Sequence, residues 1–266
     1  MIDNPRSPRV RAVAKLEKRS ARAETGLFLV EGPQAVEEAL AFRPGGLVDV
    51  FMTAKAIDRY SDLVRTATAA GLEVEQVSEA VLDAMADTVT PQGVLATCRT
   101  FAATLDELFA TGPQLIAVLE EVRDPGNAGT IIRAADSAGA TGVILSGNAV
   151  DAFNPKVVRS TTGSIFHLPI VQGVTLDAAV GAARAAGLQI LAADVKGADL
   201  PGIRDALARP SAWVFGNEAH GLPDEHLRLA DQVVKVPIYG HAESMNLATA
   251  ASVCLYESAF AQRAER

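Results

Sequence analysis

The residues that could do chemistry gather in three polar loops in the second half of the sequence, each placed after a predicted strand. The loops lie in the stretches LEEVRDPGNAGTIIRAADSAGA, WVFGNEAHGLPDEH and VVKVPIYGHAESMNLATAASVCLYE. Their polar residues of interest are Asn127 and Arg133, Asn217 and Glu218, and Ser244 and Asn246. Because ligands of parallel α/β sheets bind at the carboxyl ends of the strands, we expect the three loops to form one site.

Some of the polar residues in these loops have an ordinary structural explanation. Arg133 can form an exposed pair with Asp136 at i+3, which is worth about a few tenths of a kcal/mol. The two acids behind Pro223 are usual at the start of a helix. Asn217 and Glu218 come earlier, at the end of a strand, where no such explanation applies. They therefore stay candidates for a site.

Several classes of enzyme lack their signatures in this sequence. Neither the glycine fingerprint of dinucleotide-binding proteins nor the phosphate-binding loop is present, and no nucleophile elbow of the G-x-S-x-G type occurs. The four histidines show no metal-ligand spacing, so no metal site is expected. Cys98 and Cys254 match no metal or redox spacing and fall in apolar segments, which predicts reduced core residues.

Length and composition indicate a globular protein of one large or two modest domains. The chain has 266 residues, of which 49% are hydrophobic. Its N-terminus lacks the apolar core of a signal peptide, and no apolar run approaches the roughly 18 residues that a membrane span requires. We therefore expect a soluble protein of the cytoplasm.

The charge of the chain is distributed unevenly. The net charge is −8, yet residues 1–25 contain seven Lys or Arg against three acids. A helix is predicted from Arg6 to about Glu24, and its spacing would place four cations on one face, namely Arg11, Lys15, Lys18 and Arg22. Such a face attracts phosphate, which leaves a nucleic-acid partner possible despite the negative net charge, and a solvated face without a partner is the alternative explanation.

The first 100 residues alternate between short strands and helices. Expected elements are strand Gly26–Val30, helix Pro33–Phe42, strand Leu47–Thr53, helix Ala54–Ala70, strand Leu72–Val77, helix Ser78–Asp87 and strand Gly93–Cys98. This α/β unit contains no nucleophile–base pair or metal cluster, so residues 1–100 are interpreted as a binding module. Residues 101–113, with a short helix Leu105–Phe109 and a Thr-Gly-Pro breaker, are the predicted linker.

Residues 114–266 alternate again and form the second predicted domain. Expected elements are strand Leu115–Leu119, helix Ala128–Ala138, strand Gly142–Leu145, a helix around Pro155–Ser160, strand Ile165–Val171, helix Leu176–Ala186, strand Leu188–Val195, strand Ala212–Gly216, a short helix from Pro223, strand Val233–Ile238 and a terminal helix. Strands separated by helices predict an α/β fold with a mainly parallel sheet that is covered on both faces.

The terminal strand and helix have further consequences. Ser244 occupies a position suited to a helix N-cap, and the helix continues to about Ala261. It is apolar on more sides than a peripheral helix of a monomer requires, which predicts a dimer that buries it. Small residues that would let another helix approach are Ala250, Ala251 and Ala259.

Taken together, the three loops resemble the three motifs of the SpoU/TrmH family of ribose 2′-O-methyltransferases, within the SPOUT superfamily. The matching patterns are N-x-x-x-x-x-R, G-N-E-x-x-G-L and P-I-x-G-x-x-E-S-M-N-L, in this order from about Leu115 to Glu257. Residues 1–100 also resemble, less specifically, the ribosomal-protein-like substrate-binding extension of the members that act on rRNA. One departure is Asn217, where many relatives have Ala or Ser.

The resemblance implies a fold, an assembly and a site. The fold is an α/β sheet with a deep C-terminal trefoil knot, and the functional unit is a homodimer. S-adenosylmethionine is held largely by backbone groups, which by motif position belong to Gly216, Val236, Ile238, Met245 and Leu247. The positions that match catalytic and substrate-facing residues are Asn127, Arg133, Glu218, Ser244 and Asn246.

The implied reaction is the transfer of a methyl group from a sulfonium to a ribose hydroxyl by in-line displacement, so alignment of oxygen, methyl and sulfur supplies much of its rate. The family assigns proton removal to the arginine, here Arg133, but a guanidinium is rarely neutral. Arg133 can instead hold a phosphate or stabilise the alkoxide, with Glu218 or water accepting the proton. The N-terminal module favours 23S rRNA as substrate over tRNA. A non-catalytic RNA-binding protein and a small-molecule α/β enzyme are the competing hypotheses.

Overall fold

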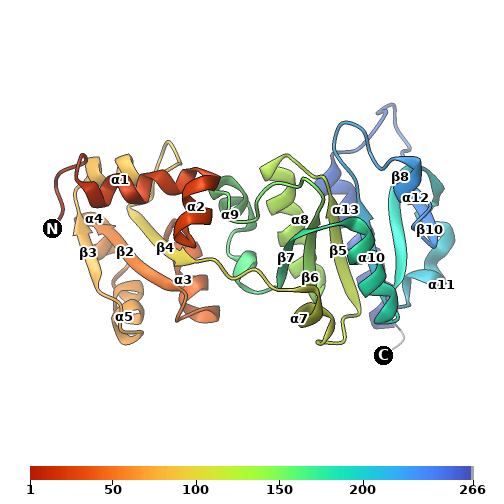
Figure 1. Cartoon of the computed structure of the whole chain (residues 1–266), viewed down its shortest axis with the longest axis horizontal. Coiled ribbons are helices and arrows are strands. Elements are labelled where there is room, and N and C mark those ends of the chain that lie inside the picture. The colour runs from red at the N-terminus through yellow and green to blue at the C-terminus, as the bar shows by residue number, and fades with distance from the viewer. Residues whose placement is uncertain (265–266) are drawn as a thin grey trace. The chain divides into compact units, whose positions relative to one another are not determined.

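The computed structural model describes residues 1–264, which divide into two compact units. The N-terminal unit comprises Met1–Phe101 together with Phe153–His167, and the C-terminal unit comprises Ala102–Ala152 and the chain from Leu168 onward. Figure 1 labels the helices and strands of both units. No helix within residues 1–264 is long and apolar enough to cross a membrane.

The N-terminal unit is built on a four-stranded sheet with the strand order β1-β4-β2-β3. The strands are β1 (Leu27–Glu31), β2 (Leu47–Thr53), β3 (Val74–Val77) and β4 (Val94–Arg99). The pair β2–β3 is parallel, while β4 runs antiparallel to both of its neighbours. The helices are α3 (Pro33–Phe42), α4 (Ala54–Arg59), α5 (Ser61–Ala69) and α6 (Glu79–Met85). One predicted helix, Ala54–Ala70, is thus divided in two at Tyr60.

The predicted continuous helix from Arg6 to Glu24 is wrong. The structure has three short pieces there, α1 (Pro8–Ala14), the 3-10 turn η1 (Lys15–Glu17) and α2 (Arg19–Thr25). Lys18 interrupts them with an extended backbone, φ −90° and ψ 133°. The break lets apolar residues before it turn into the core against the strands and α6, namely Val10, Val13 and Leu16. The four cations therefore do not share one helical face.

Arg22 differs from the other three cations of that predicted stripe. Arg22 is only 3% exposed, and its Nη1 donates to the carbonyl oxygens of Leu16 and Glu17 at 2.9 and 2.8 Å. A buried guanidinium that satisfies the carbonyls of a broken turn holds the chain together and is not presented to RNA. Arg11, Lys15 and Lys18 are exposed. The RNA-binding prediction for Arg22 is withdrawn on this ground.

A segment from the middle of the sequence completes the core of the N-terminal unit. Phe153 and Phe166 pack on Phe28, with ring centroids 4.8 and 6.3 Å apart. Between them lie α9 (Pro155–Thr161) and the 3-10 turn η2 (Ser164–Phe166). The predicted strand Ile165–Val171 is wrong, because the strand begins only at Ile170, after this aromatic packing. The prediction from chain order had placed the whole segment in the second domain.

Polar contacts also fasten this segment to the N-terminal unit. Arg159 on α9 forms ion pairs of 2.7 Å with Glu31 and with Asp87. His167 Nε2 lies 3.0 Å from Glu38 Oε2 on α3. The Arg159–Glu31 pair is largely withdrawn from solvent, so removing one partner would leave a poorly solvated charge.

The C-terminal unit contains a six-stranded parallel sheet with the order β10-β8-β9-β5-β6-β7, which confirms the predicted α/β fold. Its strands are β5 (Leu115–Glu120), β6 (Gly142–Ser146), β7 (Ile170–Val174), β8 (Gln189–Asp199), β9 (Ser211–Phe215) and β10 (Gln232–Lys235). Its helices are α7 (Leu105–Phe109), α8 (Pro125–Ala138), α10 (Leu176–Ala185), α11 (Arg204–Leu207), α12 (Asp224–Leu227) and α13 (Leu247–Ala264), with the 3-10 turn η3 (Leu200–Ile203).

Helices cover both faces of this sheet, as predicted. Helices α8 and α13 pack together on one face, and α10 packs on the other (Figure 1). Trp213 in β9 donates from Nε1 to Ser258 Oγ of α13 at 2.8 Å, so the helix is tied to the sheet by a buried hydrogen bond. Ala251 and Ala259 are buried within this chain. For these two residues the prediction that they admit a partner's helix is wrong, since the chain covers them itself. Ala250 is only partly buried, and for it the statement stays a prediction.

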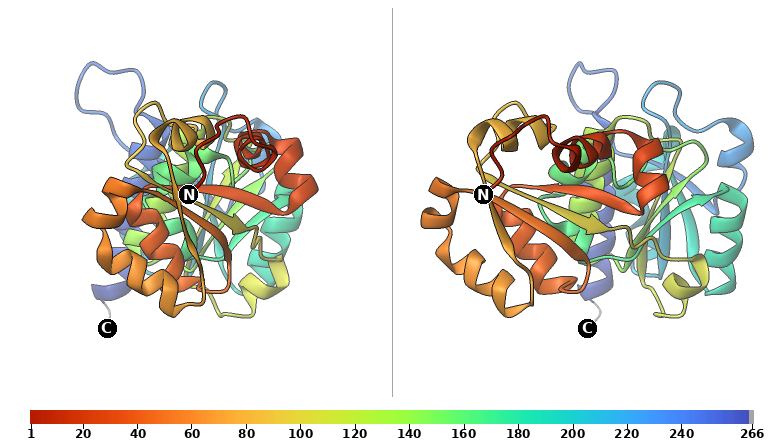
Figure 2. Two further views of the ribbon diagram at one scale, coloured as in Figure 1. Left: turned by 90° about the vertical axis from the view of Figure 1, so that its left-hand side faces the viewer. Right: turned by 60° about the vertical axis from the view of Figure 1, so that its left-hand side comes forward.

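The terminal strand is shorter and less buried than predicted. It ends at Lys235, and Val234 is its one buried residue among the four. The chain then continues to Asn246 without regular structure, and Figure 2 shows this loop projecting from the unit. The predicted cap at Ser244 is wrong. Asn246 Oδ1 caps α13 instead, accepting from the backbone N–H groups of Ala248 and Thr249 at 2.9 and 3.2 Å.

Candidate active site

The loops that follow β5, β9 and β10 meet through side-chain hydrogen bonds, as the parallel topology predicts. The Glu218 carboxylate, after β9, accepts from the backbone N–H groups of Arg123 and Asp124 at 3.2 and 3.1 Å. It also accepts from Asn127 Nδ2 at 3.3 Å. One carboxylate thus holds the loop that leads into α8 and orients an amide at the start of that helix.

A second amide extends this contact to the third loop. Asn246 Nδ2 donates to Asn127 Oδ1 at 2.9 Å, while the Oδ1 of Asn246 caps α13. We call Asn127, Glu218 and Asn246 the amide–carboxylate cluster. Its three members come from three motifs that are far apart in the sequence, and the hydrogen bonds run in series between them. Each side chain is therefore positioned by the next.

The local sequence fixes the start of α8 and with it Asn127. Pro125 is the first helical residue, where a missing N–H costs nothing, and Asp124 Oδ1 accepts from the Asn127 backbone N–H at 2.7 Å. The helix N-cap is therefore Asp124, which leaves the Asn127 side chain free to serve the cluster. An amide nitrogen carries two hydrogens, so Asn127 keeps one donor beyond its bond to Glu218.

Asn217 has a clear structural duty, which the sequence had left open. Its Nδ2 donates to the Glu121 carbonyl oxygen at 2.8 Å, and its Oδ1 accepts from the Ala219 backbone N–H at 2.9 Å. Glu121 has a φ of 51°, a backbone conformation that non-glycine residues seldom adopt. Asn217 therefore clamps a strained turn of the β5 loop to the β9 loop, next to the cluster.

Two of the five predicted catalytic or substrate-facing residues lie outside the cluster. Arg133 is exposed on α8, and within residues 1–264 its side chain makes no hydrogen bond or ion pair. At about 100° per residue it stands roughly a third of a turn around the helix from Asn127. Ser244 is exposed in the loop before α13. Neither residue is held by the groups that hold Glu218.

The predicted cofactor positions lie along the ends of β9 and β10. Gly216 is buried, and a Cβ added there would come within 2.6 Å of the Gly221 backbone. The remaining positions, Val236, Ile238, Met245 and Leu247, follow β10. Within residues 1–264, the backbone groups of residues 236–245 make no hydrogen bonds with other backbone groups. The backbone N–H and C=O groups of this segment are therefore available to hydrogen-bond a ligand.

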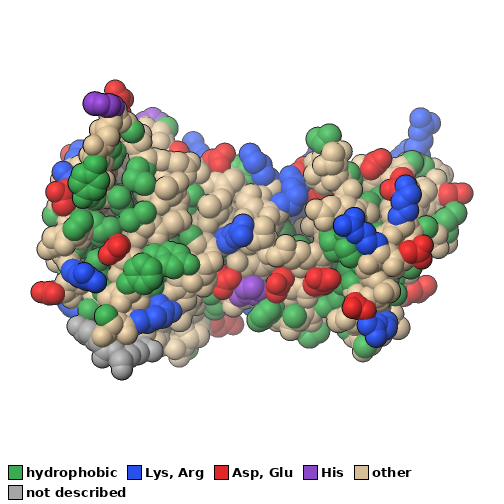
Figure 3. All heavy atoms as spheres, turned by 180° about the vertical axis from the view of Figure 1, so that it is seen from behind, with side chains coloured by type: hydrophobic (Ala, Val, Ile, Leu, Met, Phe, Trp, Pro, Cys, Tyr) green, Lys and Arg blue, Asp and Glu red, His purple; other side chains and the backbone are tan. Residues whose placement is uncertain are grey.

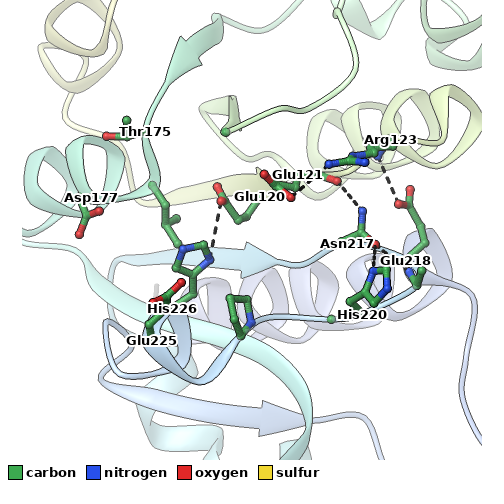
Figure 4. Close-up of a pocket in the computed structure, with 15 residues that line it drawn as sticks. Glu120, Glu121, Arg123, Thr175, Asp177, Asn217, Glu218, His220, Glu225 and His226 are labelled. Atoms are coloured by element: carbon green, nitrogen blue, oxygen red, sulfur yellow. Dashed lines mark hydrogen bonds and ion pairs between the residues drawn. The ribbon is translucent and has the colours of Figure 1, made fainter.

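A cavity of about 800 Å³ opens beside the cluster, over the carboxyl ends of β5, β6 and β9. Figure 4 shows the residues that line it, among them Glu120, Asn217, Glu218 and His226. A smaller cavity of about 290 Å³ touches Val236 and Tyr239. Sequence reasoning missed Glu120 and His226. A carboxylate at the end of an otherwise apolar strand was the available signal for Glu120.

Neither cysteine takes part in the site. Burial raises the pKa of both the Cys98 and the Cys254 thiol to about 12, so neither is a ready nucleophile. Both are free and buried, which confirms the prediction of reduced core residues. Among residues 1–264, no group of three or more His, Cys, Asp or Glu could hold a metal ion.

Comparison with protein families matches each half of the chain to a separate description. Residues 114–256 match the SpoU rRNA Methylase family. Residues 7–96 match the MRM3-like substrate binding domain. The first match spans more than half of the chain and contains all three motif loops.

Similar proteins carry related descriptions over nearly their whole length. The 23S rRNA (guanosine(2553)-2′-O)-methyltransferase RlmP of Bacillus subtilis is 34% identical over 96% of this chain and 97% of its own. The 23S rRNA (uridine(2479)-2′-O)-methyltransferase of Streptomyces viridochromogenes is 34% identical over 92% and 86%. A crystal structure of an AdoMet-bound rRNA methyltransferase from Sinorhizobium meliloti superposes with a TM-score of 0.84 at 32% identity, covering 97% of this chain and 96% of that one.

Proposed function

The chain belongs to the SpoU rRNA methylase family, and we propose that it transfers a methyl group from S-adenosylmethionine to a ribose 2′-hydroxyl of 23S rRNA in the cytoplasm. The observation that carries this proposal is the amide–carboxylate cluster. Glu218, Asn127 and Asn246 are joined by hydrogen bonds although they come from three separate loops. A rigid polar group at the carboxyl ends of parallel strands is a suitable place to orient a ribose.

Glu218 acts in this proposal as a positioning residue. Its two oxygens already accept three N–H donors, from Arg123, Asp124 and Asn127. A carboxylate committed in this way is poorly placed to take the proton of the 2′-hydroxyl. Its effect on the reaction comes through Asn127, whose remaining amide hydrogen points to a role in holding a ribose oxygen. The proton then passes to water.

Arg133 supplies positive charge to the RNA. Its guanidinium is exposed and has no partner within residues 1–264, so it is available for a ligand. A guanidinium stays protonated and presents a planar fork that fits a phosphate. We therefore assign Arg133 to the phosphate next to the reacting ribose, in preference to the role of general base. Ser244 is also exposed, and we assign it to the same RNA-contacting surface as Arg133.

S-adenosylmethionine, when bound, supplies a methyl carbon that a hydroxyl oxygen can attack in line, with the cofactor's sulfur leaving as a thioether. The residues proposed to hold it are Gly216 and the four after β10, Val236, Ile238, Met245 and Leu247. Two observations support this assignment. The backbone groups of residues 236–245 make no hydrogen bonds with other backbone groups within residues 1–264, and the chain turns tightly at Gly216. Backbone contacts make an acidic ribose-binding side chain unnecessary.

The N-terminal unit is proposed to bind RNA. Its candidate contacts remain Arg11, Lys15 and Lys18, because they are exposed and lie in residues 1–25, which we call the basic segment. The similarity of residues 7–96 to a substrate-binding domain supports this assignment. The domain boundaries 1–100, 101–113 and 114–266 along the sequence are part of the same proposal, and the segment Phe153–His167 of the second domain packs with the N-terminal unit.

A homodimer is proposed through the exposed face of α13. Tyr256 and Phe260 are 37% and 57% exposed on consecutive turns, with ring centroids 5.6 Å apart. Tyr239, in the preceding loop, is 90% exposed. Figure 3 shows hydrophobic side chains gathered near the C-terminal end of the chain. Phe260→Glu should yield monomers in sedimentation at micromolar concentration, and a wild-type monomer with full activity would contradict the proposal.

A deep trefoil knot is proposed for the C-terminal end. The support is the course of the chain from the edge strand β10 back to α13, which packs beside α8 on the face of the sheet. A Cβ at Gly197 would come within 2.4 Å of the Val233 and Val234 backbone, so β8 and β10 approach closely there. A crystal structure in which the traced backbone contains no knot would contradict the proposal.

The function is tested with purified protein, labelled S-adenosylmethionine and unmodified transcripts. Transfer to 23S rRNA, with the modified position mapped by its resistance to alkaline cleavage, is the expected result. Transfer to tRNA alone would assign the other substrate. Cofactor binding without transfer to any RNA would indicate a non-catalytic RNA-binding protein. No binding of S-adenosylmethionine would remove the methyltransferase proposal.

A further inference from the structure

The cavity of about 800 Å³ is not used by the steps proposed above, although Glu218 forms part of its wall. Its floor is made by the ends of β5 and β6, and α12 closes one side. Glu120 at the end of β5 and His226 on α12 point toward one another inside it (Figure 4). A cavity of this size that adjoins the proposed reaction site calls for an occupant.

Glu120 is the residue that determines which occupant fits. It is 6% exposed, and one carboxylate oxygen accepts from Ser146 Oγ at 2.5 Å. The other oxygen lies 3.7 Å from His226 Nδ1, which is too far for a hydrogen bond. That Nδ1 is buried without a hydrogen-bond partner within residues 1–264. That nitrogen is closed to a ligand, whereas Glu120 lines the cavity. A poorly solvated carboxylate oxygen without a donor is costly, so a ligand with N–H donors would stabilise it.

Gly147 keeps the Glu120 carboxylate open to the cavity. A Cβ at position 147 would lie 3.0 Å from Glu120 Oε1 and 3.0 Å from Glu121 Cγ. Its φ of 62° is also one that glycine adopts most readily. Any side chain there would press on the free carboxylate oxygen.

The charge of the lining excludes an anionic occupant. Four further acids surround Glu120, against a single arginine, namely Glu121, Asp177, Glu218 and Glu225. A phosphate would be repelled here, and so would a carboxylate ligand. The part of an RNA that is neutral, flat and rich in N–H donors is the base. A ribose held at the neighbouring cluster carries one such group on its C1′ atom.

We propose that this cavity binds the base of the nucleotide whose ribose is methylated, and that Glu120 selects guanine. The inference rests on the proposed function, whose substrate it specifies. Guanine presents two adjacent N–H donors, at N1 and N2, which a carboxylate accepts. Adenine and cytosine have an acceptor at the ring nitrogen of that edge, and uracil has carbonyls on both sides of its one donor. The carboxylate would repel them.

The nucleotide that the wild-type protein methylates is the first test. Mapping of the 2′-O-methyl group in a 23S rRNA transcript should place it on a guanosine. Methylation of uridine, adenosine or cytidine would overturn the inference and leave the proposed function intact. Absence of methylation on any RNA would instead be a failure of the proposed function, so the two failures are distinct.

The second test uses Glu120→Gln, which keeps the shape and replaces one acceptor by a donor. We expect kcat/KM on the transcript to fall about 10- to 100-fold, the usual value of a paired contact to a base edge. Dissociation constants for S-adenosylmethionine should stay within twofold, which also shows that the variant is folded. A charge-matched control, Glu73→Gln at an exposed site of the N-terminal unit, should behave as wild type.

Inosine at the mapped position separates reading of the base from mere support of the site. Inosine lacks only the 2-amino group. The wild-type protein should lose about tenfold in kcat/KM on a ligated transcript that carries it, while Glu120→Gln should lose less than twofold. Equal losses in both proteins would overturn the assignment of Glu120. A weaker affinity of the variant for S-adenosylmethionine would show that the cavity serves the cofactor instead.

Discussion

The amide–carboxylate cluster and the N-terminal basic segment were both inferred from residue spacing, and only the first is assembled as expected. Glu218, Asn127 and Asn246 meet through hydrogen bonds across three loops. In the basic segment, by contrast, the chain breaks at Lys18, and Arg22 turns inward to donate to Leu16 and Glu17. The residues of the cluster lie together as predicted, whereas the four cations of the basic segment do not share one face.

The difference lies in what each inference required of the fold. The loops needed only that their strands be parallel members of one sheet. Strands β5 and β9 pair directly, and the long loop from β10, which lies one strand beyond β9, brings Asn246 to them. The cationic stripe needed an uninterrupted helix over about five turns, and helical spacing has no meaning across a break. Inference from strand ends therefore tolerates local error, whereas inference from helical phase fails with a single extended residue.

Substitution of Arg133 should have the largest effect and extends the comparison to a residue outside the cluster. Arg133→Ala should lower the transfer rate about 10²–10³-fold, because one charged contact to the reacting RNA is lost. Affinity for S-adenosylmethionine, measured by calorimetry, should stay within a few-fold. Arg133→Lys keeps the charge but loses the planar fork, so it should fail at every pH with weakened RNA binding. A lysine variant whose activity rises with pH would identify Arg133 as the base.

Glu218→Gln tests whether the cluster works as a positioning device. The variant amide must direct an NH₂ group at the backbone N–H of Arg123 or Asp124, which displaces the β5 loop. The transfer rate should fall about 10²-fold, since misplacement by about 1 Å has that cost. Single-turnover rates across pH would report it. A pH profile that loses one limb in the variant would mean that Glu218 accepts the proton after all.

Removal of the exposed cations should weaken RNA binding moderately. The triple variant Arg11→Ala, Lys15→Ala, Lys18→Ala should reduce the slope of log affinity against log salt by up to about 3, one for each lost phosphate contact. A matched control removes three exposed cations of α4 and α5 in the same unit, namely Lys55, Arg59 and Arg65. Equal slopes for both triple variants would make the basic segment an ordinary solvated surface.

Arg22→Ala should have the smallest effect on RNA binding and a distinct effect on stability. Two carbonyl oxygens lose their donor, which should lower the free energy of unfolding by about 1–3 kcal/mol. Thermal melting of the N-terminal unit would show a lower midpoint, while the salt slope for RNA stays that of the wild type. A changed slope with an unchanged midpoint would return Arg22 to the RNA surface.

Much of this protein follows from the sequence alone. Alternation of short apolar strands with amphipathic helices is a local property, and it predicts the parallel sheet and the order of its elements. The three motif loops are equally local, and their place after strands brings Asn127, Glu218 and Asn246 to one edge. The burial of Cys254 in the terminal helix also follows from the spacing of apolar residues.

Tertiary structure alone decided the rest, because each of those features depends on partners distant in the sequence. Phe153 and Phe166 belong to the N-terminal core since Phe28 lies there to receive them. Asn246, and not Ser244, caps α13 because the helix begins only at Leu247, and the Asn246 amide is also bonded to Asn127. Glu120 became a candidate only when β6 and α12 placed Ser146 and His226 beside it. Periodicity records which side of an element is apolar, but it does not record which other element covers that side.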